Sequence, residues 1–172
     1  CSMGYHRAGF AVVGTDLKDQ PNYPHEFHQD NALHALDALL AGDEWNGYRL
    51  PDFAAVHASP PCQAHSSIAK QQRVRFPGTY DARHLDLVDD TRRRLRATGL
   101  PYVIENVIGA PLENPAMLCG SSFGLNVRRH RLFEVRGFSL MTPPCAHHWQ
   151  TPRFRSLDKR RGDKSVVPVH GG

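Results

Sequence analysis

The sequence predicts an α/β fold, with a doubly wound and mostly parallel sheet covered by helices. Two observations predict it. Short apolar runs alternate along the chain with segments of helical periodicity, and those segments end at glycines. The 172 residues are enough for one domain with a hydrophobic core.

Four segments are expected to be strands, because each is a short run rich in apolar residues. They are residues 11–16, 53–58, 102–105 and 131–135. Residues 31–41 have leucines at helical spacing, and Gly42 is suited to end that helix.

The longest predicted helix covers residues 81–98 and ends before Gly99. Its acids come early and its arginines late, as the helix dipole prefers. Leu85, Val88 and Leu95 are expected on its buried face.

Composition limits the classes of function. The net charge of +4 and the pI of about 9.0 fit a polyanionic partner. No apolar run reaches the roughly 20 residues that span a bilayer, and no export leader is apparent, so we expect no membrane partner and a cytoplasmic location.

The four cysteines are far apart in the sequence, which favours reduced thiols over a disulfide framework. Cys145, His147 and His148 are conceivable metal ligands, with Cys119 as a fourth. Their spacing matches no standard zinc pattern, so a polar loop without a metal is the preferred interpretation.

Reactive side chains follow the ends of the predicted strands. Cys62 lies in a turn made rigid by Pro60 and Pro61, and Glu105 ends a later strand. Asp16 ends the first strand. Ligands bind at the carboxyl ends of parallel strands, so these groups are expected to share one site.

Three short motifs occur in a fixed order along the chain: Pro61-Cys62-Gln63, Glu105-Asn106-Val107 and Arg129-His130-Arg131. In this order they resemble the motifs of the DNA cytosine-5 methyltransferase family, of bacterial or phage type. The resemblance extends over residues 1–136. It implies a sheet of the Rossmann-like type found in S-adenosylmethionine-dependent methyltransferases.

The resemblance also implies a reaction. Cys62 would add to carbon 6 of a flipped-out cytosine in double-stranded DNA, and carbon 5 would then take the methyl group of S-adenosylmethionine. Glu105 would hold the ring nitrogen and amino edge of the base, while Arg129 and Arg131 would orient the ring oxygen and the acid.

Further roles follow from the same resemblance. The Pro60 carbonyl and Asn106 would contact the base, and residues 64–79 would close over it. The expected cofactor contacts are those of Asp16, Asp30 and Pro61.

The sequence departs from the family at its ends. The glycine-rich cofactor loop and the first strand are not seen before Cys1, so truncation at both ends is expected. Residues 1–136 would be the catalytic domain, and residues 137–172 the start of a target-recognition region or a loop.

Three alternatives stay open: a tRNA cytosine-5 methyltransferase, a non-catalytic DNA-binding remnant, and a metal-binding module around Cys145. The preferred interpretation is a monomeric enzyme acting on double-stranded DNA in a bacterial cell or a phage-infected host.

Overall fold

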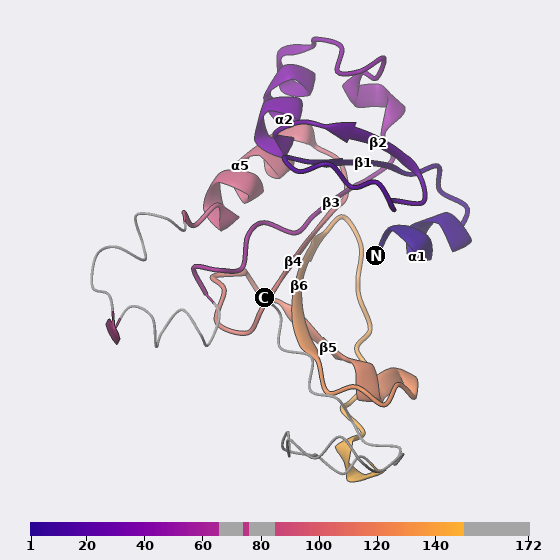
Figure 1. The fold of residues 1–172 in the computed structure, drawn as a ribbon, viewed down its shortest axis with the longest axis vertical. Helices are drawn as coiled ribbons and strands as arrows, with labels where there is room; N and C mark the ends of the chain where they lie inside the picture. The colour runs from indigo at the N-terminus through magenta and orange to yellow at the C-terminus, as the bar shows by residue number, and fades with distance from the viewer. Residues whose placement is uncertain (66–73, 76–84, 150–172) are drawn as a thin grey trace. The chain divides into compact units, whose positions relative to one another are not determined.

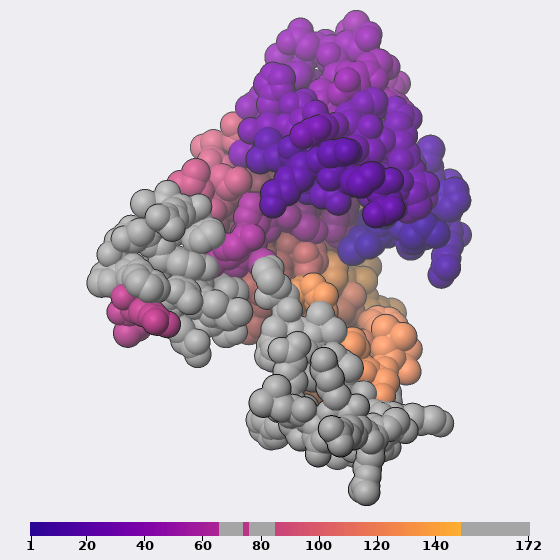
Figure 2. Space-filling model, in the orientation of Figure 1, coloured from indigo at the N-terminus to yellow at the C-terminus, as the bar shows by residue number. Residues whose placement is uncertain are grey.

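The computed structural model describes residues 1–65, 74–75 and 85–149. The chain divides into two compact units (Figures 1 and 2). Unit 1 contains Cys1–Ala54 and Arg93–Gly99, and unit 2 contains Ala55–Arg92 and Leu100–Gly172. Both units combine helix and strand, and parallel strand pairs occur in both, so the fold is mixed α/β.

Unit 1 has a two-stranded parallel sheet. Its elements in chain order are α1 (Ser2–Arg7), β1 (Val13–Asp16), β2 (Glu26–Gln29), α2 (Ala32–Ala41) and the 3₁₀ helix η1 (Leu50–Asp52). The register of β1 on β2 runs from Val13 opposite Glu26 to Asp16 opposite Gln29. Strand β2 was not predicted, because its alternation of polar and apolar residues is only four residues long.

Helix α2 agrees closely with the predicted helix at 31–41. The side chain of Asn31 caps its first turn by accepting a hydrogen bond from the Leu33 amide. Gly42 ends the helix in the left-handed conformation, at φ +86°, which glycine adopts without steric cost. The buried side chains of α2 pack with Trp45 in a small core made of Ala35, Leu39, Trp45 and the partly buried Val13, Tyr48, Leu50 and Phe53.

Unit 2 is built on a four-stranded sheet with the order β3-β4-β6-β5. Its elements are β3 (Val56–Ala58), β4 (Tyr102–Asn106), β5 (Ala116–Cys119), η2 (Gly120–Phe123), β6 (His130–Arg136) and η3 (His147–Trp149). Strand β4 has neighbours on both sides, and Tyr102, Val103 and Ile104 are all buried. The apolar sequence of β4 therefore matches its central position.

Strand β6 differs from the expectation of a mostly parallel sheet. It runs antiparallel to both β4 and β5, whereas β3 and β4 are parallel. A parallel return from β4 to β6 would need a crossover connection, usually through a helix. The chain between them instead forms the short strand β5 and the 3₁₀ turn η2, so the sheet of unit 2 is mixed rather than mostly parallel.

Helix α5 (Val88–Thr98) is shorter than the predicted helix at 81–98, of which residues 81–84 are outside the described part. Asp86 accepts a hydrogen bond from the Val88 amide, and this carboxylate cap marks the start of the helix. Val88 and Leu95 are fully buried, as expected, but Leu85 precedes the cap and is exposed.

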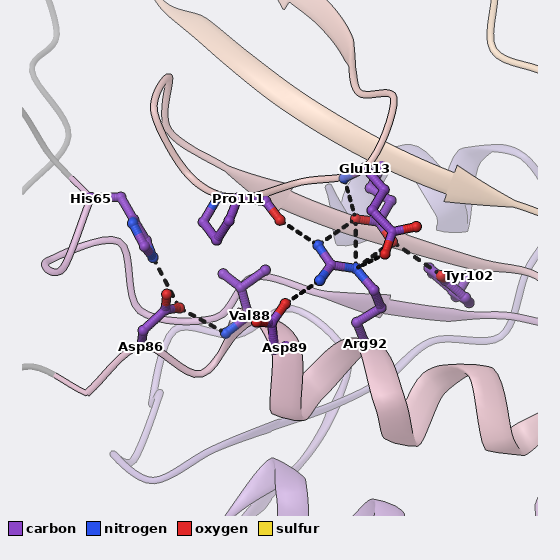
Figure 3. A network of polar contacts seen from close by, with 9 residues as sticks. His65, Asp86, Val88, Asp89, Arg92, Tyr102, Pro111 and Glu113 are labelled. Atoms are coloured by element: carbon purple, nitrogen blue, oxygen red, sulfur yellow. Dashed lines mark hydrogen bonds and ion pairs between the residues drawn. The ribbon is translucent and has the colours of Figure 1, made fainter.

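Arg92 is the centre of a buried polar network within unit 2 (Figure 3). Its Nε donates to both carboxylate oxygens of Glu134 on β6, at 2.9 and 3.0 Å, and its Nη1 pairs with Asp89. Tyr102 Oη and the Glu113 amide also donate to Glu134. Burial raises the pKa of Glu134, but the hydrogen bonds from Arg92 and Glu113 outweigh burial, so that pKa is lowered overall.

Several expectations concern residues outside the described part. The predicted closing loop at 64–79 is described only at 64–65 and 74–75, and the predicted recognition region at 137–172 only as far as 149. Over the residues that are described, no helix is long and apolar enough to cross a bilayer.

Candidate active site

Cys62 lies in the loop that follows β3, as the sequence predicted. Its side chain is half-buried, between the exposed Pro61 and the exposed Gln63. The His65 amide donates to the Cys62 carbonyl at 3.0 Å, which closes a turn around the cysteine. All four cysteines lie in described residues, and none of them forms a disulfide in the structure.

A partly buried hydrogen bond connects the loop that bears Cys62 to β4. Asn106 Nδ2 donates to the Pro60 carbonyl at 3.0 Å, and Asn106 Oδ1 accepts from the Val107 amide at 2.8 Å. Asn106 is 1% exposed, so both polar ends of its amide are satisfied inside the protein. In this conformation Asn106 positions the cysteine loop, while the predicted contacts of Pro60 and Asn106 with a base stay predictions.

Glu105 and Arg131 form an ion pair at the same end of the sheet. Arg131 Nε lies 2.8 Å from Glu105 Oε1, and the two side chains are 16% and 20% exposed. Glu105 lies opposite Phe133 in the β4–β6 ladder, and Arg131 is two residues from Phe133 on the same face. The antiparallel direction of β6 therefore places the start of that strand beside the carboxyl end of β4.

Arg129, the other predicted arginine, precedes β6 and is exposed. It lies before the ladder begins at His130, so the β4–β6 pairing does not fix its side chain as it fixes Arg131. The structure thus brings Arg131, but not Arg129, into contact with the acid.

His65, three residues after Cys62, points toward the carboxylate at the start of α5 (Figure 3). Its Nε2 lies 2.9 Å from Asp86 Oδ1, the carboxylate that caps α5. Burial raises the pKa of Asp86, but the contacts with His65 and with the Val88 amide exceed this effect and lower it. The turn that begins at Cys62 is thereby linked to the start of a helix.

His57 on β3 is the ionisable group nearest in sequence before the cysteine loop. Burial lowers the pKa of its imidazole to about 4, so the ring is neutral near pH 7. Its Nε2 lies 3.2 Å from Ser59 Oγ, in the turn that leads to Cys62.

The two predicted cofactor residues of unit 1, Asp16 and Asp30, lie at the carboxyl ends of the paired strands β1 and β2. Asp16 ends β1 and Asp30 follows β2, and the Asp30 amide donates to the Asp16 carbonyl at 3.1 Å. The carboxylate of Asp16 is exposed and accepts from the Lys18 amide. It lies at the carboxyl end of a parallel strand, where α/β sheets bind ligands.

Asp30 has a different environment from Asp16. Trp45 Nε1 donates to Asp30 Oδ2 at 2.9 Å, and the Asn31 amide donates to Oδ1 at 2.7 Å. The indole hydrogen bond is the main cause of the lowered pKa of Asp30. This carboxylate anchors Trp45 in the core of unit 1, a structural role that the sequence did not reveal.

No family model and no curated protein matches this chain. The structure assembles the cysteine loop, Glu105 and Arg131 in unit 2, and Asp16 with Asp30 in unit 1. His130, the middle residue of the Arg129-His130-Arg131 motif, is a potential ligand group that the sequence did not indicate; it lies opposite Cys119 in the β5–β6 ladder.

Proposed function

We propose that this protein is a DNA cytosine-5 methyltransferase with Cys62 as its nucleophile, built on a doubly wound sheet of the Rossmann-like methyltransferase type. The observation that carries the proposal is the ion pair of Glu105 with Arg131 on the strand next to the one that leads into the Cys62 loop. A cysteine, a carboxylate and a guanidinium held at one sheet end are the groups that nucleophilic activation of a pyrimidine needs.

The chemistry begins at the thiol of Cys62. As a thiolate it adds to carbon 6 of the cytosine ring, and the electron pair of the 5,6 double bond becomes available at carbon 5. S-adenosylmethionine, when bound, would supply the methyl group to carbon 5, and its methyl–sulfur bond would break to leave S-adenosylhomocysteine. Loss of the proton from carbon 5 then restores the double bond and expels the Cys62 thiolate, so the protein is regenerated.

Glu105 assists this addition from the edge of the base. The Glu105 carboxylate can accept from the exocyclic amino group, and in its protonated form it can donate to ring nitrogen 3 as electron density builds up there. The Arg131 guanidinium holds the Glu105 carboxyl in place at 2.8 Å. Arg129, exposed at the start of β6, is free of the ladder and suited to reach a ring oxygen or a phosphate.

The donor set in unit 1 suits the nucleoside part of S-adenosylmethionine. Asp16 presents an exposed carboxylate to a ribose diol. Asp30 keeps lone pairs beyond those that Trp45, Asn31 and His34 contact, and these can accept from an adenine amino group. Pro61, exposed beside Cys62, is the third proposed cofactor contact.

Covalent trapping tests the proposal. Protein is incubated with S-adenosylmethionine and duplex DNA that contains 5-fluorocytosine, whose fluorine cannot leave as a proton does. We expect a denaturation-resistant adduct at Cys62, its loss in Cys62→Ser, and its retention in the control Cys1→Ser. An adduct that survives Cys62→Ser refutes the assignment.

The nucleic acid is tested in parallel. Trapping on a tRNA substrate and not on duplex DNA would replace DNA by RNA as the substrate. DNA binding with no adduct on either substrate would indicate a non-catalytic DNA-binding protein.

A further inference from the structure

Four side chains with metal-binding atoms converge in unit 2: Cys119, His130, Cys145 and His147. Their four ligand atoms all lie within 4.8 Å of one another. Cys119 Sγ is 3.1 Å from His147 Nε2, and Cys145 Sγ is 3.4 Å from His130 Nε2. The group thus contains two sulfur and two nitrogen ligands and no carboxylate.

The spacing of these atoms is close to that of a tetrahedral zinc site. With Zn–S bonds of about 2.3 Å and Zn–N bonds of about 2.0–2.1 Å, ligand atoms at tetrahedral corners are about 3.3–3.8 Å apart. The two sulfur–nitrogen distances are near this range: 3.1 Å is just below it and 3.4 Å is within it. All separations between the four ligand atoms are at most 4.8 Å, so a decrease of roughly 1 Å in the longest of them would complete the tetrahedron.

Hydrogen bonding alone explains this arrangement poorly. Thiols are weak donors and weak acceptors, and a neutral imidazole has one donor and one acceptor. Cys119 is nonetheless 2% exposed, and the two histidine rings are packed edge to face with centroids 5.1 Å apart. Thiolate and imidazole ligands in a tetrahedral arrangement are the preferred set for Zn²⁺.

The sheet supplies two of the ligands. Cys119 ends β5 and lies directly opposite His130, the first residue of β6. In antiparallel ladders such opposite residues have neighbouring Cβ atoms on the same face. These two ligands are therefore held together by backbone pairing before any metal binds.

The other two ligands come from a segment that contacts η2. Ser122 Oγ donates to the Pro144 carbonyl at 3.0 Å, and the Ala146 amide donates to Ser121 Oγ at 3.2 Å. Ser121 Oγ also lies 3.1 Å from Cys119 Sγ, and Ser121 is 2% exposed. Hydrogen bonds of this kind orient the ligands around a metal.

We propose that Cys119, His130, Cys145 and His147 bind a structural zinc ion, which fastens residues 145–147 to the β5–β6 end of the sheet. Four protein ligands fill the tetrahedron and leave no position for water or substrate, so the ion stabilises the fold and does no chemistry. His148, which the sequence offered as a ligand, is exposed and outside the group, and His130 takes its place.

The proposed zinc site also affects the next residue of β6, Arg131. Successive side chains of a strand point to opposite faces, so His130 and Arg131 face opposite ways at the start of β6. Zinc on His130 fixes the strand end from which Arg131 reaches Glu105. This consequence for catalysis rests on the proposed function, whereas the zinc site itself does not.

Metal analysis of the purified protein tests the site. The protein is expressed with a tag that lacks histidine, and zinc is measured by plasma mass spectrometry in the absence of DNA and methyl donor. We expect about one zinc per chain, with about tenfold or greater loss in His147→Asn and Cys145→Ser. The matched controls His148→Asn and Cys1→Ser keep their zinc.

Cobalt substitution reports the geometry. Protein stripped of zinc and titrated with Co²⁺ should develop the visible bands of tetrahedral cobalt and the near-ultraviolet band of thiolate ligation, and His148→Asn should do the same. Cys145 is exposed, so Cys145→Ser carries the test even if Cys119→Ser, at a buried position, does not fold.

Two results would overturn the proposal. One is zinc content in the native protein no higher than in His147→Asn. The other is a Cys119–Cys145 disulfide, found by peptide mapping of protein purified under nitrogen. Because neither measurement uses DNA, a failed zinc test leaves the methyltransferase proposal intact, and a failed trapping test leaves the zinc site intact.

Discussion

Arg131 reaches Glu105 diagonally across the β4–β6 ladder, with Nε 2.8 Å from Oε1, and this pair joins two sequence motifs that are 26 residues apart. The diagonal exists because β6 runs antiparallel to β4. If the strands ran in the parallel direction that the sequence suggested, the start of β6 would lie at the opposite end of β4 from Glu105.

Removing the guanidinium should impair the reaction without unfolding the protein. Arg131→Gln is expected to slow covalent trapping about 10²-fold, because a displaced carboxyl no longer meets the base edge. Arg136→Gln, at the exposed far end of β6, is the control and should trap at the normal rate. Equal rates in the two variants would mean that the pair has no catalytic role.

Substitutions of Asp16 and Glu105 should change two different quantities. The first should change the affinity for S-adenosylmethionine, and the second the rate of the chemical step. Asp16→Ala removes an exposed carboxylate proposed to bind ribose, so the dissociation constant of S-adenosylmethionine should rise by about tenfold or more while DNA binding is unchanged. Glu105→Gln should leave that constant near its normal value and lower the rate of the chemical step. Calorimetry and single-turnover trapping measure the two quantities, and identical profiles would refute the division of roles.

The hydrogen bond from Asn106 to Pro60 should hold the loop that bears Cys62 in a single conformation. Asn106→Ala leaves the Pro60 carbonyl without its buried donor and is expected to destabilise the fold by about 1–3 kcal/mol. Hydrogen exchange should accelerate at the amides of residues 62–65, while the amides of α2 in unit 1 serve as an internal reference. Unchanged exchange in the loop would show that Asn106 does not hold it.

The ion pair of Arg92 with Glu134 should contribute far more to the free energy of unfolding than the ion pair of Arg94 with Asp37. Arg94 lies on the same helix as Arg92, and Asp37 lies on α2. Arg92→Met leaves the Glu134 carboxylate buried at 3% exposure and is expected to cost about 3–5 kcal/mol in urea denaturation. Arg94→Met breaks the more exposed contact with Asp37 and should cost about 1 kcal/mol or less. Similar losses for both variants would contradict the importance given to burial.

His57 should make stability depend on pH in a defined window. The folded protein keeps this imidazole neutral down to a pKa of about 4, whereas the unfolded chain takes up the proton near pH 6.5. The part of the free energy of unfolding that depends on a neutral His57 is therefore fully present above pH 6.5 and is lost as the pH falls toward 4. In His57→Gln, the decline in stability between pH 6.5 and 4 should be shallower than in the native protein, by up to about 3 kcal/mol over the window. Parallel pH profiles would show that His57 does not titrate in this way.

The sequence by itself determined the local elements and the identity of the reactive groups. Helix α2, with its Asn31 cap and Gly42 end, follows from residue spacing and backbone preference. The core strand β4 follows from its apolar run, and the turn after β3 from Pro60 and Pro61. These features depend on neighbours in the chain, so a single sequence contains the signals for them.

Only the tertiary structure decided the direction of β6 and therefore the partners of its side chains. Pairing direction is set by how the chain returns between strands, and the segment before β6 has no helical periodicity that distinguishes the two directions. Three contacts join residues that are distant in sequence: Arg131 with Glu105, Trp45 with Asp30, and Cys119 with His147. Such contacts leave no fixed spacing in a sequence, because loop lengths and pairing register determine them together.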